Sequence, residues 1–424
     1  MVMSLRYHRG MTFRSMPALA CLLLACAGCA TRPAPPPPPT VLLVSVDGLR
    51  PTDITPAQMP VLNALGDAGV RADGMRPSFP ALTFPNHYAL VTGLRPDHHG
   101  IVHNTMHDAT LGSFRTASRE AVGTAGWWGG VPVWVSAERA GLRTATMFWP
   151  GSEAAIHGVR PHTWRAYADD TRAADNAATV IAWLAVPASQ RPRFATLYLD
   201  QVDEASHEHG PDSPQAQAAR TEVDAALGEL LHSLQQRGLH DAVNLVVVSD
   251  HGFASVPPDQ RIATTDMVPA NLAEAISDGQ VIGFAPLPGK TAETERVLLG
   301  RHAQYACWRR QELPARWQYG THPRVPAIVC QMDPGWDALW PGKVEWLQQH
   351  QPQQMRGSHG YDPDLPSMRA SFIASGPAFR TQVTLPVFDN VDVYPLLMRL
   401  LHLPAEPNDG DLTPLLPALR GHTP

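Results

Sequence analysis

The chain has 424 residues, of which 44% are hydrophobic, and it carries a formal net charge of −6. A chain of this size can bury a large core, either as one large α/β domain with an insertion or as two domains. The acidic balance, with lysine present only at Lys290 and Lys343, argues against a protein that coats nucleic acid.

The first 29 residues have the pattern of a lipoprotein-type signal peptide. Basic residues precede an apolar run from about Met16 to Ala27, which is too short to span a bilayer as a mature helix. Cys26 and Cys29 both fit a bacterial lipoprotein cleavage site, and an ordinary cleaved signal is the alternative. We therefore expect an exported protein that is periplasmic or held at a membrane by a lipid anchor.

Residues 30–40 predict a Pro-rich linker, because five prolines in a row favour a stiff polyproline spacer. Beyond the linker the cysteines are Cys307 and Cys330. An even pair in an exported protein predicts one disulfide.

Apolar, β-branched runs alternate with helical patterns through the rest of the chain. Such runs predict strands buried on both faces of a parallel sheet. The strands are expected at 41–46, 143–148, 194–199, 244–248 and 370–374, and the helices at 55–69, 131–140, 177–184, in a long amphipathic segment ending at Gly238, and at 391–401. We expect an α/β fold with a doubly wound, mostly parallel sheet and helices on both faces. Residues 41–424 form the catalytic domain in this interpretation, and 262–355, where the pattern weakens, form a smaller inserted subdomain.

Thr83 lies between an irregular Pro-containing segment and the apolar run 88–92. Pro85 suits the first turn of a helix, so Thr83 is expected at a helix N-terminus among free backbone N–H groups. A threonine hydroxyl is a poor nucleophile unless a base or a metal activates it. Taken alone, Thr83 fits a simple helix cap as well.

Three of the predicted strands lead into carboxylates, namely Asp47, Asp203 and Asp250. The carboxyl ends of parallel strands share one edge of a sheet, and three acids there would repel one another unless a cation lay among them. Histidines stand nearby at His207, His251 and His359. Mixed Asp and His ligation suits zinc, with manganese or iron as alternatives. With the Thr83 oxygen, the seven groups suit two metal ions better than one.

The order of these motifs resembles the nucleotide pyrophosphatase/phosphodiesterase branch of the alkaline phosphatase superfamily. The matching pieces are Val44–Gly48, Thr83–His87 with Thr92–Leu94, His99–Asn104, Trp127–Trp134, Trp149–Ser152, Asp203–Pro211, Ser249–Gly252 and His359–Asp362, and they run in family order from about 41 to 401. Departures at Val202, where the family usually has Pro, and at Ser206, where it usually has Gly, leave the ligand positions in place.

The resemblance implies an alkaline phosphatase-like fold and two Zn²⁺ ions. The first ion would be held by Asp203, His207 and His359, and the second by Asp47, Asp250, His251 and the Thr83 oxygen. Thr83 is then the nucleophile, and a phospho-threonine intermediate follows from its attack on phosphorus.

The remaining site residues that the resemblance implies contact the substrate. Asn104, together with the N–H of Phe84, would stabilise charge on a non-bridging oxygen. Phe84 and Tyr198 match the positions of aromatic residues that clamp a nucleobase.

The absence of arginine around Thr83 and in the Asp250 loop favours a singly charged diester over a dianionic monoester. We therefore expect a hydrolase of nucleotide phosphodiester or pyrophosphate bonds that releases a nucleoside monophosphate. Its partner is a small-molecule substrate, and no protein partner is implied. The alternatives are a phospholipid or glycerophosphodiester head-group phosphodiesterase on the same site, and an inactive surface module that keeps the fold for binding.

Overall fold

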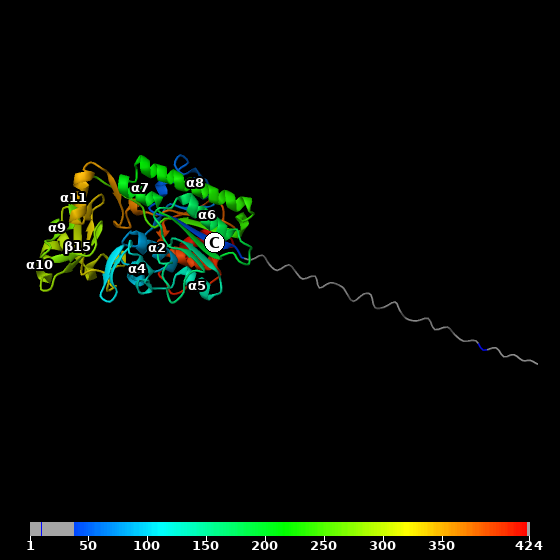
Figure 1. Cartoon of the computed structure of the whole chain (residues 1–424), viewed down its shortest axis with the longest axis horizontal. Coiled ribbons are helices and arrows are strands. Elements are labelled where there is room, and N and C mark those ends of the chain that lie inside the picture. Colours follow the sequence, from blue (N-terminus) through cyan, green and yellow to red (C-terminus); the bar gives the residue numbers. More distant parts are fainter. Residues whose placement is uncertain (1–9, 11–37, 422–424) are drawn as a thin grey trace, which may run out of the picture. The chain divides into compact units, whose positions relative to one another are not determined.

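The computed structural model describes residue 10 and residues 38–421 (Figure 1). The predictions for the signal segment and for most of the Pro-rich linker therefore lie outside the described residues. Of the helices that are described, none is both long enough and apolar enough to cross a membrane.

An eight-stranded sheet forms the centre of the domain. Its order is β20 (Val383–Leu385), β2 (Val70–Ala72), β19 (Phe372–Ser375), β9 (Val243–Val248), β1 (Thr40–Val46), β8 (Phe194–Leu199), β6 (Thr144–Met147) and β7 (Thr163–Arg165). All neighbours pair in parallel except at β19, which runs antiparallel to both β9 and β2. The three central strands β8, β1 and β9 are buried along their whole length, as their apolar runs predicted.

Helices cover both faces of this sheet, and the alternation of side chains along β1 shows why. Leu42 and Val44 belong to the apolar core beneath α1 (Pro60–Ala68), α6 (Ala173–Leu184) and α8 (Pro214–Gln236), whereas Val41 and Leu43 belong to the core on the other face. That second core contains residues of α2 (Thr83–Thr92), α5 (Val133–Arg139) and α12 (Val393–Leu400). In Figure 1, α6 and α8 lie on one side of the sheet and α2 and α5 on the other. The predicted doubly wound fold is confirmed.

The predicted helix start at Thr55 is wrong. Residues 56–58 form only a turn, and α1 begins at Pro60, which occupies the first helical position. The free N–H groups of Val61 and Leu62 donate to the Asp224 carboxylate of α8, each at 2.9 Å. The N-terminus of α1 is therefore capped by a residue of another helix, which the sequence around α1 could not indicate.

A second sheet occupies the segment between β9 and β19. It is antiparallel throughout, with the order β12 (Ala273–Ala275), β13 (Val281–Pro286), β16 (Ile328–Met332), β15 (Tyr305–Arg309) and β14 (Gly300–Arg301). Together with α9 (Thr264–Met267), α10 (Thr291–Leu298) and α11 (Pro341–His350), it forms the yellow end of the domain in Figure 1. Most of its buried apolar residues belong to a core cluster that also includes Ala81, Tyr361 and Met368. The sheet lies within the segment expected to form an inserted subdomain, and the limits 262–355 stay a prediction.

Short elements complete the connections around the sheet edge. Four two-stranded sheets pair β10 (Ala254–Val256) with β18 (Arg356–Ser358), β11 (Arg261–Ala263) with β17 (Asp337–Leu339), β3 (Met75–Arg76) with β21 (Phe388–Asp389), and β4 (Thr105–Asp108) with β5 (Gly112–Arg115). The remaining α-helices of the described part are α3 (Pro96–His99), α4 (Arg119–Gly123) and α7 (Gln201–His209). The β10–β18 pair is the most important of these for the site, because β18 brings the chain back from the inserted segment to the edge of the central sheet.

A disulfide joins Cys307 to Cys330, as predicted. The two residues lie directly opposite each other on β15 and β16, so the bond ties neighbouring strands of the inserted sheet. Both cysteines are buried in the subdomain core.

We expect the protein from residue 30 onward to show no free thiol when it is denatured without a reductant, and two after reduction. Because the bond closes a loop with a sequence separation of 23, replacing both cysteines by serine should lower the free energy of unfolding by roughly 3 kcal/mol. Thiol titration and urea unfolding measure the two effects. Two titratable thiols in the unreduced protein would contradict the prediction.

Candidate active site

Thr83 is the first residue of α2, so its hydroxyl lies at the N-terminus of that helix, as expected. The N-cap position belongs to Leu82 and not to Thr83. The turn before the helix is held by Asn86, whose side-chain oxygen accepts the N–H of Ser78 at 2.7 Å and whose amide donates to the carbonyls of Pro80 and Leu82. Asn86 is fully buried, whereas Thr83 is partly exposed.

Asp47, Asp250 and His251 form one compact group at the carboxyl ends of β1 and β9. Their potential ligand atoms lie within 4.8 Å of one another, and all three residues are buried. His251 Nε2 lies 2.9 Å from Asp250 Oδ2, 3.4 Å from Asp47 Oδ1 and 3.3 Å from Thr83 Oγ1. Gly48, with φ of 70°, turns the chain after β1 and donates its N–H to Asp250 Oδ1 at 3.2 Å.

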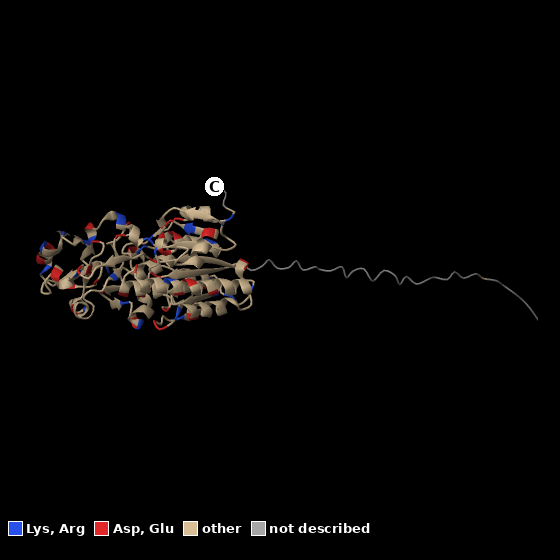
Figure 2. Ribbon diagram, turned by 90° about the horizontal axis from the view of Figure 1, so that it is seen from above, with Lys and Arg blue, Asp and Glu red and all other residues tan. Residues whose placement is uncertain are grey.

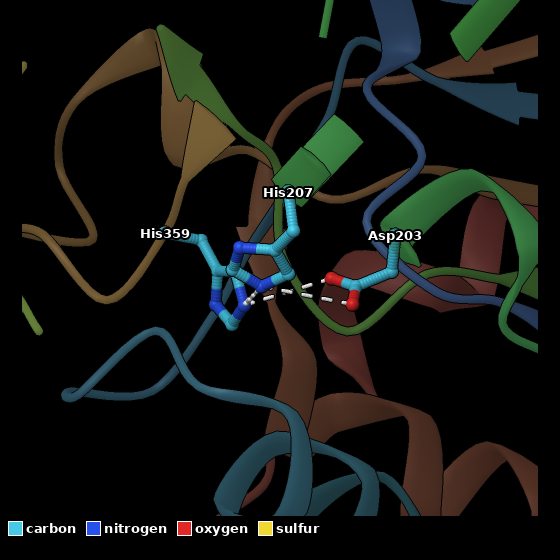
Figure 3. Close-up of side chains that lie close together, drawn as sticks. All are labelled: Asp203, His207 and His359. Carbon is cyan, nitrogen blue, oxygen red and sulfur yellow. Dashed lines mark hydrogen bonds and ion pairs between the residues drawn. The ribbon is translucent and has the colours of Figure 1, made fainter. Parts of the chain in front are cut away.

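Asp203, His207 and His359 form a second group (Figure 3). Asp203 and His207 lie one turn apart on α7, and His359 follows β18. His359 Nε2 lies 3.6 Å from Asp203 Oδ1, and His207 Nε2 lies 3.7 Å from Asp203 Oδ2. The two groups divide the six side chains as the resemblance implied, while their role as metal ligands stays a prediction.

The histidines of the two groups all contact a backbone carbonyl oxygen through Nδ1, so Nε2 faces the other members of the group. Nδ1 of His207, His251 and His359 lies 3.1, 3.0 and 2.9 Å from the carbonyl oxygens of Gly357, Gly252 and Ala81. A carbonyl only accepts, so each Nδ1 is protonated and, in the neutral ring, each Nε2 presents a lone pair. Burial, reinforced by Arg356, lowers the pKa of His207 to about 3, so this ring is neutral at pH 7.

These lone pairs face other acceptors. His207 Nε2 and His359 Nε2 are only 3.0 Å apart. In addition, one buried oxygen of each carboxylate lacks a hydrogen bond: Oδ1 of Asp47, Oδ1 of Asp203 and Oδ2 of Asp250. Acceptors that converge without a donor are satisfied by a cation among them, so both groups fit a metal ion. Nitrogen and carboxylate donors in groups of three suit zinc.

Electrostatics at the two groups agrees with this fit. Burial, together with the charge of Asp250, raises the pKa values of Asp47 and Asp203 well above the usual range. A cation would relieve the repulsion that these two carboxylates experience.

Two buried side chains outside the groups, Tyr198 and His87, contact Asp47 and Asp250. The Tyr198 hydroxyl donates to Asp47 Oδ2 at 2.7 Å. His87 Nδ1 lies 2.9 Å from the Thr83 carbonyl and 3.3 Å from Asp250 Oδ2, and its Nε2 lies 2.8 Å from Ser45 Oγ. Both contacts of Nδ1 are acceptors, so His87 carries its proton there.

A cavity of about 570 Å³ opens over Thr83 and the second group. Its lining includes the predicted residues Asp47, Thr83, Phe84, Asn104, Tyr198, Asp203, His207 and His359, whereas Asp250 and His251 lie fully buried behind it. Phe84 is half-buried. Tyr198 is only 8% exposed, so it offers a ligand less surface than its position in the sequence suggested.

The cavity also contains residues that the sequence analysis missed, chiefly Tyr167, Arg119 and Glu153. Tyr167 is half-buried and donates its hydroxyl to Asp200 at 2.5 Å. Its backbone is held as well, because its N–H donates to Glu153 and its carbonyl accepts from Arg119. All three residues lie outside the predicted strand ends, so no motif pointed to them.

Asn104 lies beside the start of α2, where its side chain already has one contact. Its side-chain oxygen accepts the backbone N–H of Phe84 at 3.0 Å. In this conformation the Phe84 N–H is therefore not free to contact a substrate oxygen, in contrast to the expectation from the sequence. The side-chain amide of Asn104 remains as the donor.

Comparison with known proteins agrees with this geometry. Residues 41–362 match the type I phosphodiesterase/nucleotide pyrophosphatase family. The structure resembles murine ectonucleotide pyrophosphatase/phosphodiesterase 5 with a TM-score of 0.83 and 32% identity, over 90% of this chain and 100% of that one. An inactive variant of that murine protein in complex with AMP matches to the same extent.

Curated relatives are similar over most of this chain. Ectonucleotide pyrophosphatase/phosphodiesterase family member 3 of Rattus norvegicus is 33% identical over 380 residues, which is 87% of this chain and 43% of the rat protein. An uncharacterized pyrophosphatase/phosphodiesterase of Schizosaccharomyces pombe is 34% identical over 90% of this chain and 80% of its own length. The chain thus spans less than half of the rat relative and most of the yeast one. The chain belongs to the type I phosphodiesterase/nucleotide pyrophosphatase family.

Proposed function

We propose that this protein is a two-zinc phosphodiesterase that cleaves nucleotide phosphodiester or pyrophosphate bonds and releases a nucleoside monophosphate. The observation that carries the proposal is the Thr83 hydroxyl, which lies at a helix N-terminus, 3.3 Å from His251 Nε2, in a residue that lines the cavity together with Phe84 and Tyr167. The AMP complex of the murine relative adds support for a nucleotide ligand.

Zinc bound at the two groups would supply positive charge that eases deprotonation of the Thr83 hydroxyl and stabilises the departing oxygen. Asp203, His207 and His359 would hold one ion, and Asp47, Asp250 and His251, with the Thr83 oxygen, the other. The Thr83 oxygen attacks phosphorus, the bond from phosphorus to the leaving-group oxygen breaks, and that group departs. Water then hydrolyses the phospho-threonine, which releases the nucleoside monophosphate and restores the Thr83 hydroxyl. Asn104 donates its amide to a non-bridging oxygen, where negative charge develops.

The charges around the cavity favour a diester. Of the described residues that line it, Arg119 alone is an arginine or lysine, and its Nη1 lies 3.3 Å from Glu153 Oε1. No free guanidinium is left to bind the second negative charge of a monoester. Figure 2 shows acidic and basic residues interspersed along the described chain, an arrangement that favours a small ligand over a long polyanion.

Phe84 and Tyr167 are the two half-buried aromatic side chains best suited to contact a nucleobase. Both line the cavity, and the Tyr167 ring is supported from the side by Tyr198, with ring centroids 6.2 Å apart. We assign the second stacking surface to Tyr167 because Tyr198, chosen from the sequence, is 8% exposed. The export signal, the linker and the domain limits stated above remain part of the proposal.

We expect Thr83→Ala to lower kcat by on the order of 10³-fold or more for a nucleoside p-nitrophenyl phosphate. Zinc content should stay at two ions per chain, because each group keeps three side chains. Thr83→Ser keeps the hydroxyl and should retain measurable activity. Steady-state kinetics with elemental analysis tests this, and a wild-type rate in Thr83→Ala would exclude Thr83 as the nucleophile.

Removal of metal should abolish turnover without unfolding the protein. The apolar cores and the strands of the central sheet contain none of the six side chains of the two groups, so circular dichroism of the chelated protein should resemble that of the native form. Zn²⁺ should restore the rate, with saturation at two equivalents. Full activity in protein shown by elemental analysis to be metal-free would contradict the zinc mechanism.

Tyr167→Ala should raise KM for a nucleoside p-nitrophenyl phosphate by roughly tenfold, since stacking on one base is worth about 1–3 kcal/mol. Methyl p-nitrophenyl phosphate has no base, so its KM should change less. Trp164→Ala is the matched control, because this aromatic residue is 38% exposed and lies outside the cavity lining. Equal losses on both substrates, with glycerophosphocholine as the better substrate of the wild type, would favour the head-group phosphodiesterase.

A further inference from the structure

The two oxygens of the Asp47 carboxylate have different surroundings. Oδ2 accepts the Tyr198 hydroxyl at 2.7 Å. Oδ1 is buried without a hydrogen bond and lies 3.4 Å from His251 Nε2, on the side of its metal group. The hydrogen bond to Oδ2 thus fixes the rotation of the carboxylate and points Oδ1 toward the other members of the group.

Tyr198 itself is firmly placed. It lies near the end of β8, opposite Ser45 of β1 in the parallel register, two residues before Asp47. Its ring packs edge-to-face against His87, with centroids 5.0 Å apart, and against Tyr167. The hydroxyl therefore reaches Asp47 from a fixed point, so little conformational freedom is lost when the bond forms.

The other carboxylate of this group is held differently. Asp250 Oδ1 accepts the backbone N–H of Gly48 at 3.2 Å, and its Oδ2 is the buried oxygen without a hydrogen bond. Each acid thus has one anchored oxygen, and only in Asp47 is that oxygen anchored by a side chain, because His87 Nδ1 lies 3.3 Å from the other oxygen of Asp250, Oδ2. That anchor can be removed by substitution.

We propose that Tyr198 is a positioning residue for Asp47: by holding Oδ2, it presents Oδ1 alone as a ligand in the group of Asp47, Asp250 and His251. This inference rests on the metal binding in the proposed function, and it gives Tyr198 a task other than contact with a nucleobase. Groups that orient a metal ligand in this way contribute about 10- to 100-fold to metal affinity.

The test is Zn²⁺ binding by metal-free Tyr198→Phe, measured in competition with a chromophoric chelator. The substitution removes the hydroxyl and keeps the ring, its volume and its edge contacts. One of the two Zn²⁺ sites should weaken by about 10- to 100-fold while the other keeps its wild-type affinity. KM for a nucleoside substrate at saturating Zn²⁺ should not change.

Tyr167→Phe is the matched control. It removes a second cavity hydroxyl, but that hydroxyl donates to Asp200, which belongs to neither metal group. Both Zn²⁺ affinities should stay at the wild-type values in this variant.

A double-mutant cycle with Asp47→Asn tests whether Tyr198 acts through Asp47. Once Asp47 no longer supplies an ionised ligand, Tyr198→Phe should add no further loss of Zn²⁺ affinity. A full additional loss in the Asp47→Asn background would contradict the proposal.

Several results would overturn the inference. These are wild-type Zn²⁺ binding in Tyr198→Phe, equal weakening of both sites, the same weakening in Tyr167→Phe, or a metal-free Tyr198→Phe that is unfolded by circular dichroism. Failure of the proposed function looks different: the wild type would turn over no diester, while Zn²⁺ binding still fell at one site in Tyr198→Phe.

Discussion

Negative charge buried at the end of a parallel sheet is the constraint on which the rest of this structure depends. Asp47 and Asp250 are 1% and 0% exposed, and their neighbour His251 is also inaccessible. Burying a carboxylate costs several kcal/mol unless a positive charge or hydrogen bonds compensate. Each acid has one oxygen that accepts a hydrogen bond from the protein and one that accepts none. The protein thus offsets only part of the cost of burying these carboxylates, and the two remaining oxygens fit a cation.

The sheet makes this arrangement feasible. β1 pairs in parallel with both β8 and β9, so the chain segments that carry Asp47, Asp203 and Asp250 leave the sheet at one edge. Helix α2 then brings its N-terminus, with Thr83, to the same edge. The histidines are oriented by backbone carbonyls, which are fixed by the fold and do not depend on side-chain packing. Thr83 and both groups are therefore held before any ligand binds.

The sequence predicted those parts of the structure that depend on local pattern. Apolar β-branched runs located the three central strands, and the acids that follow them fell into the two groups seen in space. Parts that depend on distant contacts were not predictable. The start of α1 depends on Asp224 of α8, and Tyr167 lies in a connection between β7 and α6 that has no motif. The burial of Tyr198 and the bond between Phe84 N–H and Asn104 likewise arise only when separate segments meet.

The position of His359 in the chain makes one of the two groups depend on segments from both sides of the insertion. Asp47, Asp250 and His251 all precede the inserted sheet, whereas His359 follows it, directly after β18. Every side chain of one group therefore lies on the N-terminal side of the insertion, whereas the other group takes Asp203 and His207 from that side and His359 from the far side. The second group is complete only when the segments that flank the insertion have come together at one edge of the central sheet.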